Sequence, residues 1–408
     1  MKVVVQKFGG TSLASPEARS RVCSIIAEAR KQGFKPVVVV SAIGRENDPY
    51  ATDTLINLLK QVNPCPSPRE LDLLLSCGEL ISGVLLSSQL AARNVPACYL
   101  SGERAGIVTD GNYSNAHILY IKPGRLMELL AGDCVPVVAG FQGVSEEGEL
   151  TTLGRGGSDT TAAALGVALR AEVVDIFTDV EGVMTADPRI VENARLLDAI
   201  TYNEICQLAR EGAKVIHPRA VEIAMQAGIP LRVRSTFADS EGTLVANQLR
   251  GGGDNIQIIR DNLITGITYT STLAQLKISK DTPEYHDFDL AVFQAMARAD
   301  ISVDFINVQP DRITFTVLAE AGDQAVKILN DIDIFPALEF NCAKVAVVGA
   351  AMTGIPGVMA RVVEALSEKH IPILQSGDSY TNIWCLVKRE HMERAVKALH
   401  DKFELGKK

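Results

Sequence analysis

Short apolar runs alternate with helical stretches along the first 247 residues of the chain. The four clearest runs are rich in valine and isoleucine: Val3–Phe8, Pro36–Ala42, Val135–Phe141 and Val173–Thr178. Runs of this length and composition are typical of strands buried on both faces of a sheet. Because the intervening stretches have a helical pattern, we expect a largely parallel sheet between two layers of helices, an α/β domain over residues 1–247.

Two of the intervening stretches begin with a helix-start signal. Ser15 and Ser67 are each followed by proline, which suits the first position of a helix because no N–H donor is needed there. Glu70 also follows Ser67 at the spacing of a capping box. We therefore expect helices to begin at Pro16 and Pro68.

The sequence after the glycine-rich segment 250–254 contains an internal repeat. Val292 recurs as Val362 and Ile301 as Ile371, an offset of 70 residues. Each copy follows the order strand–helix–strand–strand–helix with room for a final strand, which is the ferredoxin-like βαββαβ arrangement. The glycine-rich segment is typical of a linker. The predicted domains are therefore 1–247, 264–336 and 340–408.

The two copies differ in the loop between their first strand and first helix. The second copy has TGIPG at Thr353–Gly357, whereas the first has PEYHD at Pro283–Asp287. Glycines before a helix let backbone N–H groups approach a small anion, although they also suit an ordinary tight turn. The difference indicates that the copies do not bind a ligand equivalently.

The composition narrows the class of protein. The chain has 408 residues, of which 47% are hydrophobic, and a formal net charge of −9. The apolar content excludes a disordered chain, and the acidic balance argues against nucleic-acid binding. No apolar run reaches the ~18–20 residues of a membrane span, and the N-terminus lacks a signal-peptide pattern. The eight cysteines form no CxxC pair, so we expect reduced thiols, no metal site built from protein side chains, and a cytoplasmic location.

The segment KFGGTS, at Lys7–Ser12, directly follows the first predicted strand. Its two glycines would let the backbone approach a phosphate, and Lys7 adds a positive charge at the end of the strand. The segment is neither a P-loop nor a dinucleotide-binding fingerprint. Alone, it suits a structural turn as well as a ligand site.

A second glycine-rich segment, TTLGRGGSDTT at Thr151–Thr161, is more specific. Ser158 or Asp159 could simply cap the following helix. Three glycines around an arginine would be costly for a cap alone, because each adds conformational freedom that folding must remove. Arg155 offers a planar fork that suits a carboxylate or a phosphate. Two such segments in one α/β domain favour phosphoryl transfer, which depends on positioning and charge stabilisation.

Two further features support a site in this domain. A polar segment, 178–189, follows the strand Val173–Thr178, at the carboxyl end where open α/β sheets bind ligands. Glu79 lies in an otherwise apolar helical stretch. Since a buried carboxylate is costly without a partner, Glu79 either faces a polar site or is solvated at a helix kink.

The chain resembles the bacterial aspartokinases over essentially its whole length. The resemblance rests on the paired repeats and on the motifs KFGGTS, SCGELIS, TTLGRGGSDTTAAALG and FTDVEGVMTADPR. It is closest to the monofunctional enzymes, and among these to the Bacillus-type diaminopimelate-sensitive enzyme. The resemblance implies an amino acid kinase fold, with a mostly parallel sheet between helices, followed by two ferredoxin-like ACT domains. It also implies that ATP, with Mg²⁺, phosphorylates L-aspartate to 4-phospho-L-aspartate, the first step of lysine, diaminopimelate, threonine and methionine biosynthesis.

The resemblance also implies roles for individual residues. Lys7 and Asp159 are the expected catalytic residues, with Lys7 stabilising the transferring group and Asp159 organising that lysine. The expected ATP contacts are Lys7, Phe8, Gly9, Gly10, Ser41, Thr178, Asp179, Met184, Arg189 and Lys214. Met184 stands where many relatives have tyrosine. The expected aspartate contacts are Thr52, Glu79, Arg155 and Ser158, with Arg155 on the α-carboxylate.

Feedback regulation is a further implication of the resemblance. ACT domains of this family pair across subunits and bind end-product amino acids, so we expect a homo-oligomer, dimeric or larger. His286-Asp287 replaces the usual Pro-Gly in the first copy, which counts against the family's combined lysine-plus-threonine scheme. Because the resemblance is closest to the diaminopimelate-sensitive enzyme, diaminopimelate is the favoured effector, with lysine and threonine as alternatives. The expected effector contacts are Ser302, Val303, Asp304, Thr353, Gly354, Pro356, Gly357, Gln375 and Ser376.

Two other functions fit parts of the sequence. An amino acid kinase that acts on glutamate or N-acetylglutamate would share the fold, but the paired repeats and GRGGSD count against it. A catalytically silent amino-acid sensor would need only the ACT domains. The presence of Lys7, Arg155 and Asp159 counts against a silent sensor.

Overall fold

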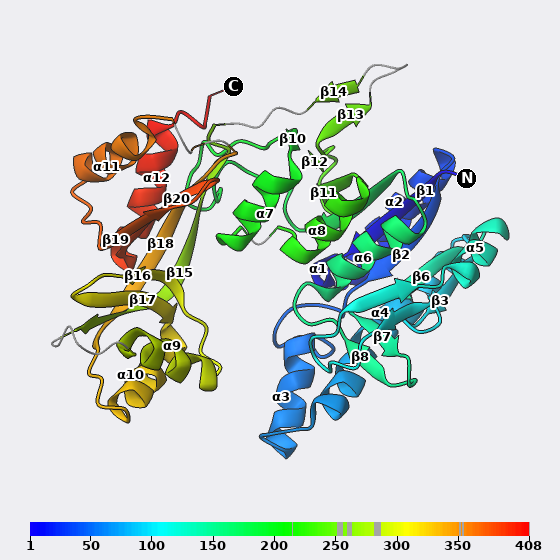
Figure 1. Ribbon diagram of the computed structural model, residues 1–408. Helices are drawn as coiled ribbons and strands as arrows, with labels where there is room; N and C mark the ends of the chain where they lie inside the picture. The colour runs from blue at the N-terminus through cyan, green and yellow to red at the C-terminus, as the bar shows by residue number, and fades with distance from the viewer. Residues whose placement is uncertain are drawn as a thin grey trace. The chain divides into compact units, whose positions relative to one another are not determined.

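The computed structural model divides the chain into two compact units, both drawn in Figure 1. The first unit contains Met1–Val183, Leu196–Arg210 and Lys214–Asp261, and the second contains Met184–Arg195, Glu211–Ala213 and Asn262–Lys408. The described residues are 1–213, 215–250, 256–258, 263–280, 287–350, 352 and 355–407. Two short segments from the first 247 residues therefore belong with the C-terminal repeats.

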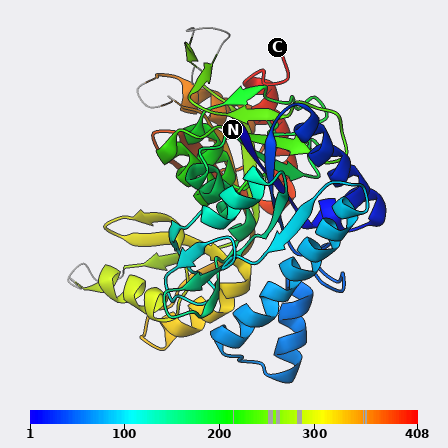
Figure 2. The same cartoon turned by 90° about the vertical axis from the view of Figure 1, so that its right-hand side faces the viewer.

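An eight-stranded sheet forms the centre of the first unit (Figures 1 and 2). Its order is β10-β12-β11-β9-β1-β2-β6-β3, and neighbouring strands are parallel except for β11 and β12. The strands are β1 (Val3–Phe8), β2 (Lys35–Val40), β3 (Ala97–Leu100), β6 (Val135–Ala139), β9 (Val173–Thr178), β10 (Ala199–Ile200), β11 (Leu231–Ser235) and β12 (Thr243–Val245). The predicted α/β class is confirmed.

The four predicted strands are β1, β2, β6 and β9. Strands β1 and β9 have the predicted bounds, whereas β2 and β6 end two residues early, at Val40 and Ala139. Phe141 has a φ of +69°, in the left-handed region, so the chain leaves the sheet after β6. The residues that follow β2 and β6 therefore contribute to the site described below instead of extending the sheet.

Helices α2 (Pro16–Lys31) and α4 (Pro68–Ala91) begin at the predicted prolines, and their N-cap serines accept backbone hydrogen bonds as expected. Both helices pack in one core with Phe8. By length and hydropathy alone, α4 would also suit a membrane span, the one such helix among the described residues. Asp72 and Glu79 are buried on it, however, and the core helix of a soluble protein passes the same test.

Helix α6 (Gly157–Ala168) covers the opposite face of the sheet, where Gly166 packs against Val174 of β9. The other helices of this unit are α1 (Gly10–Leu13), α3 (Thr52–Val62), α5 (Gly124–Ala131), α7 (Tyr202–Arg210) and α8 (Pro218–Ala227). A second sheet has the order β5-β4-β7-β8 and contains β4 (Ile107–Thr109), β5 (Ile118–Ile121), β7 (Gln142–Ser145) and β8 (Leu150–Thr152). A separate antiparallel pair is formed by β13 (Gln248–Arg250) and β14 (Ile256–Ile258).

The second unit is built on a six-stranded sheet in the order β16-β17-β15-β18-β20-β19. The first repeat contains β15 (Gly266–Ser279), α9 (Phe288–Arg298), β16 (Asp304–Val308), β17 (Arg312–Leu318), a 3-10 turn (Ala319–Ala321) and α10 (Gly322–Asn330). The second contains β18 (Ala337–Val348), α11 (Val358–Glu368), β19 (Gln375–Asp378), β20 (Asn382–Lys388), a 3-10 turn (Arg389–His391) and α12 (Met392–Lys402). The predicted order of elements is confirmed in both repeats.

Each half of this sheet takes its fourth strand from the other repeat. The start of β18 pairs with the end of β15, beside β17, while the start of β15 pairs with the end of β18, beside β20. The register of this long ladder shifts between Thr270 and Gln275. The sequence placed a final strand inside each copy. Because β15 and β18 each serve both halves, the repeats share one sheet that continues across the predicted boundary near residue 340.

Candidate active site

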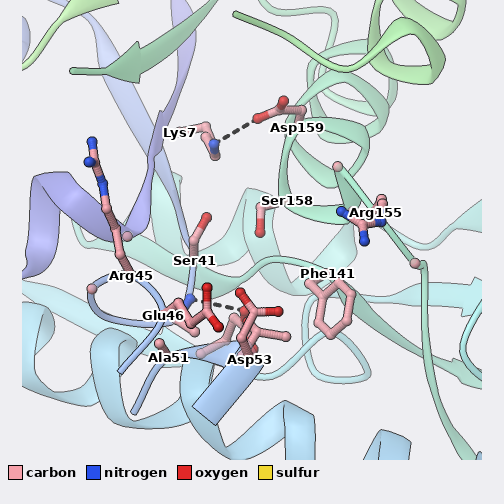
Figure 3. Close-up of a pocket in the computed structure, with 18 residues that line it drawn as sticks. Lys7, Ser41, Arg45, Glu46, Ala51, Asp53, Phe141, Arg155, Ser158 and Asp159 are labelled. Carbon is pink, nitrogen blue, oxygen red and sulfur yellow. Dashed lines mark hydrogen bonds and ion pairs between the residues drawn. The ribbon is translucent and has the colours of Figure 1, made fainter. Parts of the chain in front are cut away.

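A cavity of about 290 Å³ opens at the carboxyl ends of strands β1, β2 and β6 in the first unit (Figure 3). Its walls come from the residues after β1 and β2, the start of α3 and the loop before α6. This is the edge of a parallel sheet where ligands bind. Eight residues proposed from the sequence lie in the lining: Lys7, Gly10, Ser41, Thr52, Glu79, Arg155, Ser158 and Asp159.

Lys7 and Asp159 form an ion pair in this cavity, with 2.7 Å between Nζ and Oδ1 (Figure 3). Because side chains alternate along a strand, Lys7 shares the face of Val5, opposite to that of Phe8. Asp159 lies in the first turn of α6, where the helix N-terminus favours a negative charge. The two side chains are only 13% and 12% exposed. The pair thus keeps a lysine charge at the wall of the cavity.

No motif points to His217, yet its backbone N–H donates to Oδ2 of Asp159 at 3.1 Å, across 58 residues of sequence. His217 is the N-cap of α8, and its Nδ1 accepts from the N–H of Arg219. Its ring packs against Gly156, where any Cβ would collide with it. Burial lowers the pKa of His217, which favours the neutral ring. His217 therefore positions Asp159 through its backbone.

The segment after β1 fits closely against its neighbours. A Cβ at Gly10 would collide with the backbone carbonyl oxygens of Ala42 and Gly44, so glycine is required by space there. The hydroxyl groups of Ser12 and Thr236 are hydrogen-bonded at 2.7 Å, and both residues are buried. These contacts fix the glycine turn against the ends of β2 and β11.

Glu79 is buried on α4 and lines the cavity. Its Oε1 accepts from the backbone N–H of Ala42 at 3.0 Å, while Oε2 has no hydrogen-bond partner among the described residues. Burial raises the pKa of Glu79 to about 8. Buried polar atoms are nearly always hydrogen-bonded. The open oxygen is therefore available to a ligand in the cavity, as a donor while Glu79 is protonated and as an acceptor once it is ionised.

Arg155 lies on the loop between β8 and α6, beside Ser158 and Phe141 in Figure 3. Its exposed guanidinium makes no side-chain hydrogen bond or ion pair with the part of the chain that the structure describes. Ser158 is buried at the start of α6, and Thr52 is the first residue of α3. A free guanidinium, hydroxyl groups and an open carboxyl oxygen can bind the carboxylate and the ammonium group of an amino acid.

Comparison with known proteins identifies the family. The model of the amino acid kinase family matches residues 2–235, and an ACT domain model matches residues 337–401. The chain is 53% identical over 409 residues to Aspartokinase 1 of Bacillus subtilis (strain 168), with 100% of both chains covered. It is 40% identical to the aspartokinase of Mycolicibacterium smegmatis, with 100% of this chain and 97% of that one covered. The chain belongs to the aspartokinase family.

A solved structure supports the same assignment. The crystal structure of E. coli aspartokinase III in complex with aspartate and ADP matches with a TM-score of 0.76 and 28% identity, over 99% of this chain and 100% of that one. The chain is accordingly an aspartate kinase, with an amino acid kinase domain and a C-terminal ACT domain.

The remaining ATP contacts expected in this aspartokinase lie in different places. Asp179 follows β9 and forms an ion pair with Arg45, which lines the cavity, and Thr178 donates to Asp179 at 3.2 Å. Phe8 is fully buried and stacks on Phe177, with ring centroids 4.8 Å apart. The Phe8 side chain therefore cannot contact a nucleotide, and only its backbone is left for that role.

Three further expected ATP contacts are not among the described residues of the first unit. Met184 and Arg189 belong to the second unit, where Arg189 is paired with Asp187 at 2.7 Å. The Asp187 carboxylate also accepts from the hydroxyl of Tyr269 at 3.1 Å. Lys214 lies outside the described residues. All three were expected beside the nucleotide from the family resemblance, which gives no information on the unit to which each segment belongs.

The residues expected to bind an effector lie in the second unit. Gln375 of β19 donates to the carbonyl oxygen of Phe305 in β16 at 2.6 Å and accepts from Gln275 at 2.8 Å. Asp304 accepts from Lys344 at 2.8 Å. The structure therefore brings β16 of one repeat and β19 of the other together. The other described members of the set are Ser302, Val303, Pro356, Gly357 and Ser376, whereas Thr353, Gly354 and also His286 lie outside the described residues.

Proposed function

We propose that this aspartokinase transfers the γ-phosphoryl group of ATP to the side-chain carboxylate of L-aspartate, giving 4-phospho-L-aspartate and ADP. The observation that carries the proposal is the cavity in which a paired lysine, a free guanidinium and a half-satisfied carboxyl group meet. Aspartate presents two carboxylates and an ammonium group, which complement these groups. The product is the first intermediate of lysine, diaminopimelate, threonine and methionine biosynthesis.

The amino acid is bound by groups of opposite charge. Arg155 binds the α-carboxylate through its planar fork, and the open Oε2 of Glu79 accepts from the ammonium group. Ser158 and Thr52 complete the polar wall. The reacting carboxylate of aspartate is already ionised near neutral pH, so the transfer needs no protein base to create the nucleophile.

The nucleotide phosphates lie at the other wall. Lys7 offsets the negative charge on the phosphoryl group during transfer, Asp159 holds this lysine in place, and the backbone N–H of Gly10 faces the phosphate oxygens. The N–H of Gly9 donates to the carbonyl oxygen of Phe177 at 3.2 Å, so Gly9 can approach the phosphates only through its lack of a side chain. Ser41 lies beside the phosphates. The nucleotide contacts proposed from the family resemblance are Thr178, Asp179, Met184, Arg189 and Lys214.

Mg²⁺ enters this site with ATP. The described residues contain no group of three or more metal-ligating side chains. This fits an ion that keeps most of its shell as water and phosphate oxygens and takes one or two carboxylates from the protein. Asp159 is assigned to Lys7 and not to the ion, because its two oxygens are bound by Lys7 and by the N–H of His217. When bound, the ion offsets phosphate charge; orientation of the aspartate remains the task of Arg155 and Glu79.

A hydroxamate assay that requires both ATP and aspartate tests the proposed reaction. Hydroxylamine traps the acyl phosphate, so colour that depends on both substrates supports aspartate kinase activity. Product with glutamate or N-acetylglutamate instead of aspartate would favour the alternative kinase. No product with any acid, together with tight amino-acid binding, would favour a silent sensor.

The proposal extends to regulation by an amino acid in the second unit of a cytoplasmic homo-oligomer that pairs through its ACT domains. E. coli aspartokinase III has been crystallised with lysine and aspartate. For this chain, diaminopimelate is the favoured effector, with lysine and threonine as alternatives. Adding each one separately to the assay tests the choice. Gly357 has a φ of +93° before α11, so Gly357→Arg should abolish inhibition if that loop binds the effector.

A further inference from the structure

Two side chains outside the cavity hold the backbone of the loop that carries Arg155. We propose that Asp72 and Arg219 are positioning residues for aspartate binding, and that they act through Arg155. The proposal rests on the role proposed above for Arg155.

Asp72 lies on α4 two turns before Glu79, and its side chain has no exposed surface. Its Oδ2 accepts from the backbone N–H groups of Thr152 at 2.7 Å and Ser114 at 2.9 Å. Its Oδ1 accepts from the hydroxyl groups of the same two residues at 2.8 and 3.0 Å. Four donors from two separate segments thus converge on one buried carboxylate.

The two segments joined by Asp72 touch each other next to Arg155. Thr152 ends β8, three residues before Arg155, and its carbonyl oxygen accepts from the N–H of Ala116 at 2.9 Å. Ser114 has a φ of +64°, which is rare for a residue with a side chain, and a Cβ at Gly154 would lie 3.0 Å from its carbonyl oxygen. The loop before Arg155 is therefore packed against a segment that Asp72 holds in a strained conformation.

Arg219 joins the same two segments from α8. One guanidinium nitrogen, Nη1, donates to the carbonyl oxygen of Leu153 at 3.1 Å, and the other, Nη2, donates to that of Ala116 at 2.9 Å. The planar fork of arginine suits this double contact. Asp72 therefore binds N–H and hydroxyl groups of the two segments, while Arg219 binds their carbonyl groups.

This arrangement matters for Arg155 because its side chain has no partner among the described residues. Its position is set only by the backbone of its loop. A displacement of about 1 Å in a substrate-binding group can reduce a rate by about 10²-fold. Weakening the contacts of Asp72 or Arg219 should therefore impair aspartate binding and leave ATP binding at Lys7 unaffected.

The test uses Asp72→Asn and Arg219→Gln in the full-length chain, with KM and kcat measured for each substrate. Asparagine keeps the size of Asp72, but its amide NH₂ group is a donor and would face the N–H or hydroxyl donors of Thr152 and Ser114. We expect the KM for aspartate to rise by about 10–100-fold and the KM for ATP to stay unchanged. Asp175→Asn is the matched control, because Asp175 is an equally buried carboxylate of the same unit that pairs with Arg232 at 2.7 Å, away from the cavity lining. It should lower thermal stability without changing the KM for aspartate.

A double-variant cycle with Arg155→Ala decides whether the effect passes through Arg155. If it does, Asp72→Asn adds nothing to the KM for aspartate once Arg155 is absent. Additive effects, or an unchanged KM in Asp72→Asn, would overturn the inference. An unchanged KM in Arg155→Ala itself would overturn the proposed role of Arg155 and the inference with it. Arg219→Gln provides the same comparison if Asp72→Asn does not fold.

Discussion

Each unit contains a cluster of charged side chains with a buried carboxyl group, Glu79 in the first and Glu211 in the second, and the clusters differ in how completely this group is paired. In the first unit, Lys7 and Asp159 are paired, but Glu79 keeps one oxygen without a partner among the described residues. In the second unit, Lys344 lies between Glu211 at 3.0 Å and Asp304 at 2.8 Å. The other oxygen of Glu211 accepts from Asn382 at 3.0 Å. We call the first cluster open, because Glu79 keeps an unpaired oxygen, and the second closed, because both oxygens of Glu211 have a partner.

This difference shows how a buried charge can be assigned to a ligand or to the architecture. Leaving a buried polar atom unpaired costs free energy, and Glu79 combines such an atom with a place in the cavity lining, where a ligand can complete it. The closed cluster instead joins Glu211, which comes from the segment between α7 and α8, to the shared sheet through Lys344 and Asn382. Its function is to hold the second unit together. The predictions below test this distinction.

Lys344→Met should have the largest effect, and it should fall on stability. The substitution leaves Glu211 buried without its cation, and breaking a buried pair in this way costs about 3–5 kcal/mol. Urea denaturation of the variant and the parent chain measures the loss. Lys277→Met is the matched control, since the pair of Lys277 with Glu339 is more exposed and should contribute about 0–1 kcal/mol. Equal losses in the two variants would contradict the assignment of the Lys344 cluster to architecture.

Lys7→Ala should affect catalysis instead of stability. Loss of one preorganised charge stabiliser costs about 10²–10³ in kcat, or ~2.7–4 kcal/mol of transition-state stabilisation. Asp159 keeps its bond from the N–H of His217, and the cavity admits water, so the fold should persist. The hydroxamate assay gives kcat, and circular dichroism checks the fold. The control is Lys35→Ala, which removes an exposed pair with Asp133. Near-normal turnover in Lys7→Ala would contradict the role of Lys7.

The residues of the open cluster were easier to predict from the sequence than those of the closed cluster. Lys7, Asp159, Arg155 and Glu79 lie in or beside glycine-rich or apolar segments whose local pattern marks them as unusual. Strand β9 could be predicted to the residue because it is a short valine-rich run. These signals are local, and local patterns do not depend on how distant segments pack.

The features that could not be predicted from the sequence depend on contacts between segments that are distant along the chain. In the sequence, nothing distinguishes Asp72 from other acidic residues on helices. Only the folded chain brings Thr152 and Ser114 into contact with it. His217 lies in no recognisable site motif and acts through its backbone. Likewise, Ile190 packs in the core of the second repeat although its segment interrupts the first unit, and this association is set by tertiary packing.

The open oxygen of Glu79 predicts a pH dependence of aspartate binding. Burial raises the pKa of Glu79 to about 8, so the carboxyl group is largely protonated in the ligand-free enzyme at neutral pH. The ammonium group of aspartate requires the ionised form. The KM for aspartate should therefore fall by up to about tenfold per pH unit between roughly pH 6.5 and 8, and the KM for ATP should not follow it. Glu79→Gln should raise the KM for aspartate and abolish its slope; a slope that survives would assign it to another group.

The same pKa shift affects stability in a definite direction. Folding raises the pKa of Glu79, so the folded state binds more protons than the unfolded state between about pH 4.5 and 8. Stability contributed by the protonated form is lost as pH rises through this window, by at most ~1.4 kcal/mol per pH unit. Glu79→Gln should therefore stabilise the ligand-free first unit at pH 8 relative to the parent chain.

The smallest expected effect is the pH dependence of stability that His400 contributes to the second unit. Its sign is opposite to that of Glu79, because burial lowers the pKa of His400. His400 is fully buried on α12, its Nε2 is 3.0 Å from the hydroxyl oxygen of Thr185, and burial lowers its pKa below the usual 6.5. Because the unfolded state binds the proton more readily, stability is present above about pH 6.5 and is lost as pH falls through the lowered pKa.

Hydrogen exchange of the α12 amides measures this loss. After correction for intrinsic rates, exchange should speed up between pH 6.5 and 5. The corresponding loss of opening free energy should be less than the ~1.4 kcal/mol per pH unit that uptake of one complete proton would give. His400→Gln, which can keep a hydrogen bond to Thr185, should remove this change and leave the Glu79-dependent slope of the first unit intact. If one substitution altered the pH response of both units, Glu79 and His400 would be coupled, and treating the two units as independent would be wrong.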